Sequence, residues 1–159
     1  MRASTQRVRF RLNGGPVVAD VEPGASLLDV LRDSFALHGP RESCSQGVCG
    51  TCTVAVDGAA VSSCLFWAVL AEGRDVVTVE GLASGDALDP VQQAFIDHAA
   101  FQCGYCTPGM IVMVHRLLEE DPHPSRQDVR RYLSGSICRC GSYAEIVDAA
   151  LAAADATRA

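Results

Sequence analysis

Apolar and polar residues alternate near the start of the chain, and this pattern predicts a strand with one buried face. Two interleaved sets form its faces: Val8, Phe10 and Leu12 on one side, Arg7, Arg9 and Arg11 on the other. Asn13-Gly14-Gly15 is a hairpin-turn signal, so residues 16–21 are expected to return beside this strand.

A helix is predicted after the first hairpin. Ser26 and Asp29 have the spacing of a capping box, which marks a helix start. Apolar residues continue at helical spacing as far as Phe35, and Gly39-Pro40 is expected to end the helix.

A second hairpin follows the helix. Residues 53–56 and 59–62 flank an Asp57-Gly58 turn, and residues 75–79 read as a further short strand. Two hairpins around one helix are the plan of a small β-grasp domain.

Helical spacing dominates the second half of the chain. Four helices are expected, over residues 90–100, 108–120, 126–133 and 143–154. Cap signals precede three of them: Asp89-Pro90, Thr107-Pro108 with Thr107 at the N-cap, and Ser125 with Asp128. A glycine-containing stretch at 80–86 separates the halves. We therefore predict an α+β protein with two domains, a β-grasp domain at 1–80 and a four-helix bundle at 86–159.

The cysteines define two candidate metal sites. The first tetrad is Cys44, Cys49, Cys52 and Cys64; the second tetrad is Cys103, Cys106, Cys138 and Cys140. The spacing that opens the first tetrad is the plant-type [2Fe–2S] pattern. Gly47 and Gly50 permit the tight reversal that turns three thiolates toward one cluster. Two sets of four thiolates in 159 residues indicate electron transfer.

Two other uses of the cysteines stay open at this point. Eight cysteines could form four disulfides in a secreted domain, but Met1–Gly15 lacks the apolar core of a signal peptide. The second tetrad could hold structural zinc, although the single residue between Cys138 and Cys140 is less usual there.

Charge and hydropathy exclude several classes of function. The net charge of −6 and the scattered arginines argue against nucleic-acid binding. The longest apolar run, residues 64–71, is too short to span a bilayer. We therefore expect a cytoplasmic protein. Trp67 is expected to pack beneath the turn at Cys64, with a partner-facing position as the alternative.

The order and spacing of the cysteine motifs resemble the small iron–sulfur subunit of the molybdenum hydroxylases, the family of xanthine oxidase and aerobic carbon monoxide dehydrogenase. The resemblance rests on the loop of the first tetrad, on Gln102–Met110, and on Cys138-Arg139-Cys140 with Tyr143 after it. It covers nearly the whole chain and implies a plant-type ferredoxin-like β-grasp domain followed by a four-helix bundle.

The resemblance also implies cofactors and partners. Each tetrad would hold one [2Fe–2S] cluster. The first cluster would lie near FAD in a medium subunit; the second would lie next to molybdopterin in a large subunit. Gln102 and Cys140 match positions that touch the pterin in relatives. Electrons would pass from molybdenum through both clusters to FAD, in a dimer of heterotrimers. The chain itself would have no catalytic centre, and substrate choice would belong to the large subunit.

The sequence departs from the family pattern beside the second tetrad. Relatives commonly have Gly-Asn before the first cysteine of the final pair and Thr-Gly-Tyr after the second, whereas this chain has Ser136, Gly141 and Ser142 at or near these positions. The ligands are retained, but hydrogen bonding around the second cluster is expected to change. The alternative functions are a free-standing two-cluster ferredoxin and a structural zinc protein.

Overall fold

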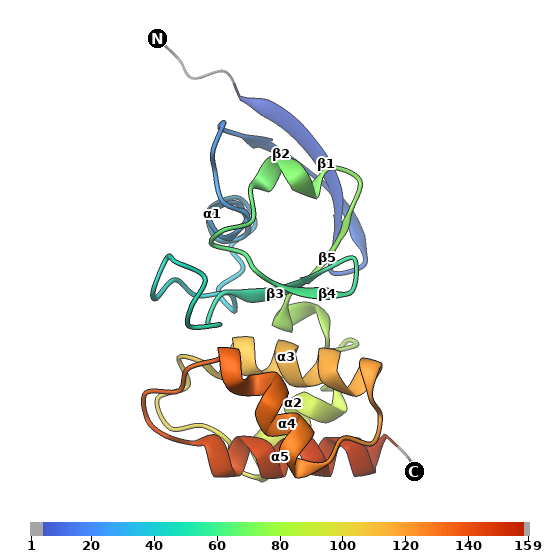
Figure 1. Cartoon of the computed structure of the whole chain (residues 1–159). Coiled ribbons are helices and arrows are strands. Elements are labelled where there is room, and N and C mark those ends of the chain that lie inside the picture. Colours follow the sequence, from blue (N-terminus) through green and yellow to red (C-terminus); the bar gives the residue numbers. More distant parts are fainter. Residues whose placement is uncertain (1–4, 158–159) are drawn as a thin grey trace.

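The alternating segment at the start of the chain forms the first strand of a five-stranded sheet (Figure 1). In the computed structural model, which describes residues 5–157, β1 (Gln6–Leu12) pairs antiparallel with β2 (Gly15–Val21). Asn13 and Gly14 connect them with φ of 51° and 83°, the left-handed pair that a two-residue hairpin turn requires. Val8, Phe10 and Leu12 are buried beneath the sheet, which confirms the predicted alternation.

The remaining strands complete the order β2-β1-β5-β3-β4. The second hairpin, β3 (Thr53–Val56) and β4 (Ala59–Ser62), has the predicted bounds. β5 (Asp75–Val77) lies between β1, to which it is parallel, and β3, to which it is antiparallel. The predicted strand at 75–79 is two residues too long, because Val79–Gly81 turns into a 3₁₀ helix.

The capping box at Ser26 is confirmed. The backbone N–H of Asp29 donates to Ser26 Oγ at 3.1 Å, and the backbone N–H of Ser26 donates to the Asp29 carboxylate at 3.3 Å. α1 (Leu27–Asp29) continues as a π-helical turn over Val30–Ser34. The expected end at Gly39-Pro40 was wrong, because Ala36 adopts a left-handed φ of 53° and reverses the chain earlier.

The C-terminal half is a bundle of four α-helices around its own apolar core. They are α2 (Pro90–Asp97), α3 (Thr107–Glu120), α4 (Arg126–Tyr132) and α5 (Tyr143–Ala156). Short 3₁₀ helices lie outside the bundle at Ala68–Ala71 and after α4 at Leu133–Gly135. Phe95, Met110 and Ile146 are almost fully buried where these helices meet. The α+β class, with a sheet part followed by a helical bundle, is therefore confirmed.

Two of the predicted helix boundaries need correction. α2 ends at Asp97 and does not reach Ala100, since Ala99 has a left-handed φ of 47°. Thr107 is the first residue of α3, and Cys106 takes the N-cap position without a side-chain hydrogen bond. A cysteine of the second tetrad thus occupies the position that the sequence pattern assigns to threonine.

The two halves meet where α3 packs against β3 and β4 (Figure 1). The sheet half and the helical half keep separate cores, with Val54 buried in the first and Val114 in the second. None of the helices within residues 5–157 has the length and apolarity needed to cross a membrane. The expectation that Met1–Gly15 is not a signal peptide falls partly on residues 1–4, which lie outside the described range, as do residues 158–159.

Candidate metal centres

The loop that carries the first three cysteines reverses direction around the sulfur of Cys44. The backbone N–H groups of Gln46 and Val48 donate to Cys44 Sγ at 3.5 and 3.4 Å. Gly47 and Gly50 both have left-handed backbones, with φ of 70° and 73°, as the sequence predicted. These backbone donors lower the pKa of the Cys44 thiol to about 6, so the loop is built to stabilise a thiolate.

The other cysteines of the first tetrad lie deeper. Cys49 and Cys52 are buried, and Cys64 is half-buried at the end of the second hairpin. Burial, followed by a hydrogen bond with Cys52, raises the pKa of Cys64 to about 11. Cys49 helps to lower the pKa of Cys44, and Cys52 helps to raise the pKa of Cys64, so the four thiols lie in two neighbouring pairs. The second hairpin therefore delivers the fourth cysteine to the ligand loop.

The second tetrad joins the loop before α3 to the loop before α5. Its thiols also meet in pairs, Cys103 with Cys140 and Cys106 with Cys138. Burial and the neighbouring Cys138 raise the pKa of Cys106 to about 12.

Backbone N–H groups lower the pKa values of two further thiols in the second tetrad. The N–H of Tyr105 lowers the pKa of the exposed Cys103. Burial raises the pKa of Cys138, but hydrogen bonds headed by the backbone N–H of Ser142 outweigh it, and the net shift is downward. The second ligand loop, like the first, directs backbone N–H groups at sulfur.

Unpaired hydroxyl groups gather around the second tetrad. The described residues contain four buried side-chain polar atoms without a hydrogen-bond partner, and three are Thr107 Oγ1, Ser136 Oγ and Ser142 Oγ. Each of these three residues lies within two positions of a cysteine of this tetrad. An unsatisfied buried hydroxyl costs about 1–3 kcal/mol. The sulfurs of a [2Fe–2S] cluster accept hydrogen bonds, so this set of thiols and hydroxyls fits such a group.

The two ligand loops touch each other directly. The backbone N–H of Ile137, next to Cys138, donates to the carbonyl oxygen of Cys49 at 2.9 Å. Beside this bond, a Cβ on Gly50 would stand only 2.6 Å from Ser136 Oγ. The backbone at Cys49 and Gly50 therefore packs closely against the segment that precedes Cys138.

A second link joins the same loops at the surface. Arg41 Nη1 donates to the carbonyl oxygen of Gly104 at 2.6 Å, and its guanidinium lies 5.3 Å from the centre of the Tyr105 ring. The Tyr105 hydroxyl donates in turn to the carbonyl oxygen of Glu42. The residues that make these contacts are 63 or 64 positions apart, so no local sequence signal could have predicted them.

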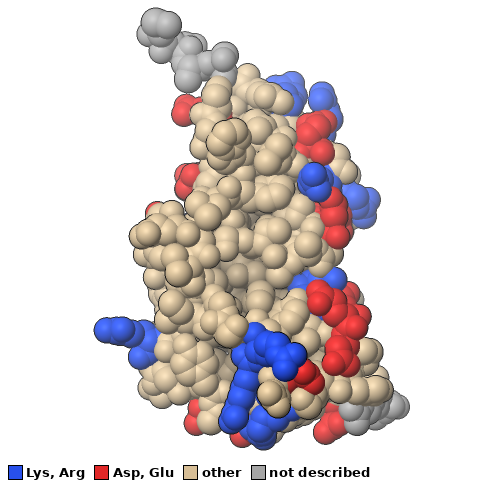
Figure 2. All heavy atoms as spheres, in the orientation of Figure 1, with Lys and Arg blue, Asp and Glu red and all other residues tan. Residues whose placement is uncertain are grey.

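A cleft opens between the tetrads. It has a volume of about 290 Å³ and is lined by Cys49 from the first tetrad and by Cys103 and Cys106 from the second. Both ligand loops reach the same flank of the molecule (Figure 1), and most of that flank is free of charged side chains (Figure 2).

Exposure also decides between two interpretations of Trp67. Its side chain is 60 % exposed, so the expectation that it packs beneath the Cys64 turn was wrong. Phe66 packs against the core of the sheet half in its place. Leu65 and Val48, both 57 % exposed, are further exposed apolar residues of the sheet half.

The two residues expected to face the pterin lie together at the surface. Gln102 Nε2 donates to the carbonyl oxygen of Cys140 at 3.3 Å, and the Gln102 side chain is exposed. No contact was predicted for Tyr143, but its hydroxyl accepts a hydrogen bond from the backbone N–H of Cys138 at 2.8 Å. The position of Tyr143, three residues after Cys140, is the sequence feature that could have indicated this contact.

All eight cysteines are free, which contradicts the disulfide alternative. Within residues 5–157, no three His, Cys, Asp or Glu side chains form a group that could hold a single metal ion.

Comparison with known families identifies both halves of the chain. Residues 10–83 match the 2Fe-2S iron-sulfur cluster binding domain, and residues 78–151 match the [2Fe-2S] binding domain. One of the nicotinate dehydrogenase subunits of Pseudomonas putida is 45 % identical over 151 residues, which cover 95 % of this chain and 96 % of that protein. The iron–sulfur interpretation is therefore favoured over zinc for both tetrads.

Solved structures agree with this result. A chain of quinoline 2-oxidoreductase from Pseudomonas putida 86 superposes with a TM-score of 0.94 at 46 % identity, covering 98 % of this chain and 97 % of that one. The aldehyde oxidoreductase of Desulfovibrio desulfuricans gives a TM-score of 0.92 at 41 % identity, covering 96 % of this chain but 17 % of that one. The same fold thus occurs as a separate chain and as part of a longer one.

Proposed function

The chain belongs to the small iron–sulfur subunits of the molybdenum hydroxylase family, and from this premise we propose that it carries electrons from a molybdopterin centre through two [2Fe–2S] clusters to FAD. A large partner subunit would hold molybdopterin, and a medium one would hold FAD. The observation that carries the proposal is the contact between the two ligand loops, Ile137 N–H to Cys49 C=O. Two four-cysteine sites joined in this way suit a relay of one-electron steps.

Each tetrad has a role in this proposal. Cys44, Cys49, Cys52 and Cys64 would hold the cluster nearer FAD, and Cys103, Cys106, Cys138 and Cys140 the cluster nearer molybdenum. The bound clusters would supply reversible one-electron chemistry. The protein would bind them through thiolates and adjust their potentials through backbone N–H groups such as that of Ser142.

The pterin contact is assigned to Gln102 and Cys140. Their mutual hydrogen bond and the exposure of Gln102 support this assignment, since both residues can be reached from outside the chain. Cys103, which is also exposed, places the second tetrad at the same surface. The large subunit would therefore cover the ends of the loops before α3 and α5.

The proposal extends to domain organisation and assembly. We assign residues 1–80 to the ferredoxin-like domain and 86–159 to the helical domain, an assignment supported by their separate cores. The complex would be a dimer of heterotrimers, and exposed apolar side chains such as Trp67 would contact a partner. A cytoplasmic location fits eight free cysteines, because thiols persist in a reducing compartment.

The decisive experiment is purification of the native complex through a tag on this chain, with iron, molybdenum, zinc and flavin measured together. Iron with molybdenum and FAD is the expected result. Iron alone, with the partner subunits shown to be expressed, would favour a free-standing two-cluster ferredoxin. Zinc without iron would refute electron transfer.

A further inference from the structure

A connection between the two tetrads runs through a single hydrogen bond. Cys49 carries both a ligand sulfur and the carbonyl oxygen that accepts from Ile137, and Ile137 is bonded to Cys138. The connection therefore passes from Cys49 Sγ along its own side chain to its carbonyl group, across 2.9 Å to the Ile137 nitrogen, and on to Cys138 Sγ. That distance is typical of a good backbone hydrogen bond.

The surrounding packing holds this hydrogen bond in place. Gly50 follows Cys49 and leaves no room for a side chain, since Ser136 Cα lies 3.2 Å from the position of a Cβ. Gly109 in α3 presses on the same segment from another direction, with its own Cβ position in overlap with the carbonyl oxygen of Gly50. Cys49 and Cys138 are both buried, so water has little access to the bond.

Ile137 contributes to this connection through its backbone N–H and not through its side chain. Its side chain is 48 % exposed and lines the cleft of about 290 Å³ together with Cys49, Cys103 and Cys106. Direct transfer between the tetrads would have to pass through space, without a chain of bonded atoms. Electronic coupling decays more slowly along bonds and hydrogen bonds than through open space, so the bonded route is the better coupled one.

The geometry points to the Cys49–Ile137 hydrogen bond as the route by which electrons pass between the two clusters, an inference that rests on the proposed function. Each passage moves one electron, so that one cluster is oxidised and the other reduced by the same amount. No covalent bond forms or breaks. Ile137 is a positioning residue here, because its N–H joins the segment of Cys138 to Cys49 and its side chain supplies no sulfur to either tetrad.

The test compares Ile137→Pro with Ile137→Ala in the purified complex. Proline lacks the N–H and removes the hydrogen bond. The preceding Ser136 has φ −115° and ψ 127°, a conformation that a residue before proline readily adopts. Ile137→Ala removes the same side chain but keeps the N–H, so it is the matched control.

Three quantities are measured in each variant: the EPR signals of both clusters, their midpoint potentials, and the rate of electron redistribution between them after rapid reduction. We expect Ile137→Pro to keep both signals and potentials but to lose most of the redistribution rate and the magnetic interaction between the clusters. Ile137→Ala should match the parent complex. A parent-like rate in Ile137→Pro would overturn the route and favour transfer across the cleft.

If Ile137→Pro loses a cluster, a second pair of variants tests the proposed electron route. Gly50→Ala should separate the loops, because its Cβ would meet Ser136, whereas Gly73→Ala, outside both tetrads, has nearly the same left-handed φ and nothing within 4 Å. Slower transfer in Gly50→Ala alone supports the route, and equal rates refute it. If the complex contains no reducible clusters at all, the proposed function itself fails, which is a separate outcome.

Discussion

Gly109 and Gly50 lie in contact across the boundary between the helical and sheet halves, so closely that a methyl group on Gly109 would overlap the carbonyl oxygen of Gly50. The Cα of Thr51 would lie only 3.3 Å away from the same methyl group. Both obstacles are backbone atoms of the first ligand loop and cannot rotate aside. The packing of α3 on this loop therefore depends on glycine.

Gly109→Ala is expected to destabilise the protein despite the better helix propensity of alanine. The propensity gain is about 1 kcal/mol, whereas inserting a methyl group into a closed contact costs about 1–3 kcal/mol. Urea unfolding of the cluster-loaded complex, followed by circular dichroism, would measure the change. Gly135→Ala is the control, since nothing lies within 4 Å of its Cβ position. Equal midpoints for the two variants would contradict the close contact.

Cys138→Ser is expected to abolish the EPR signal of one cluster and to stop turnover while molybdenum stays bound. The buried Cys138 receives backbone hydrogen bonds that favour a thiolate, and serine does not replace that ligand. Cys52→Ser should remove the other cluster signal instead. Full turnover in the Cys138→Ser complex would refute the relay.

The sequence predicted regular elements well wherever local chemistry decides the conformation. The Asn13-Gly14 turn, the Asp57-Gly58 turn and the Ser26 capping box all have the expected geometry. Each depends on residues within four positions of one another, and glycine or a short polar side chain fixes the backbone. The spacing of the cysteines likewise divides them into the two tetrads whose thiols the structure brings together in pairs.

Contacts between distant segments were not predictable in the same way. Ala36 and Ala99 end their helical segments with left-handed backbones, although alanine carries no such signal. Tertiary packing overrode local preference at both sites. The link between Arg41 and Tyr105 and the bond between Cys49 and Ile137 depend on how the two halves meet, which no periodicity encodes.

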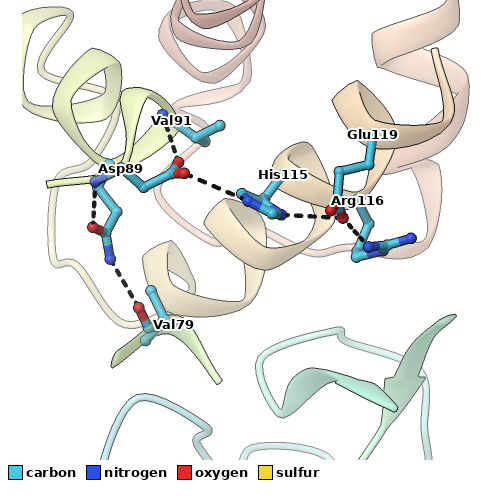
Figure 3. Close-up of polar contacts among 7 residues, drawn as sticks. Val79, Asp89, Val91, His115, Arg116 and Glu119 are labelled. Atoms are coloured by element: carbon cyan, nitrogen blue, oxygen red, sulfur yellow. Dashed lines mark hydrogen bonds and ion pairs between the residues drawn. The ribbon is translucent and has the colours of Figure 1, made fainter. Parts of the chain in front are cut away.

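Asp89 is expected to make stability depend on pH in the acid range. Burial raises the pKa of Asp89, but hydrogen bonds from His115, at 3.4 Å, and from the backbone N–H of Val91 outweigh it and leave the pKa lowered (Figure 3). A lowered pKa means that this stabilisation is present above the unfolded value of about 3.9 and is lost as pH falls through the folded value. Asp89→Asn keeps an N-cap but loses the charge.

The measurement is the unfolding free energy of Asp89→Asn and of the parent between pH 7 and the acid range. The variant should be less stable at pH 7, and the gap should close below about pH 4. Asp89→Ala should cost about 1 kcal/mol more, because it also removes the helix cap. Asp86→Asn, at an exposed position outside the helices, is the control. A gap that does not change with pH would contradict the role of the charge.

Ser142→Ala tests whether the unpaired hydroxyls serve the second cluster. Ser142 is 2 % exposed, its Oγ has no partner among the described residues, and its backbone N–H already donates to Cys138. Gly141 beside it has a left-handed φ of 84°, a conformation that glycine adopts without strain. The hydroxyl of Ser142 is therefore a candidate hydrogen-bond donor to a cluster held by the second tetrad.

A hydrogen bond to cluster sulfur stabilises the reduced, more negative state, so removing the hydroxyl should lower the midpoint potential of the second cluster. A shift of about 59 mV would change the one-electron equilibrium with the first cluster tenfold. Ser134→Ala is the control, because that exposed hydroxyl donates to the carbonyl oxygen of Arg131. An EPR-monitored redox titration in which only Ser142→Ala shifts, and only at the second cluster, would support the assignment. An unchanged potential together with higher stability would mean that the hydroxyl is merely buried without an acceptor.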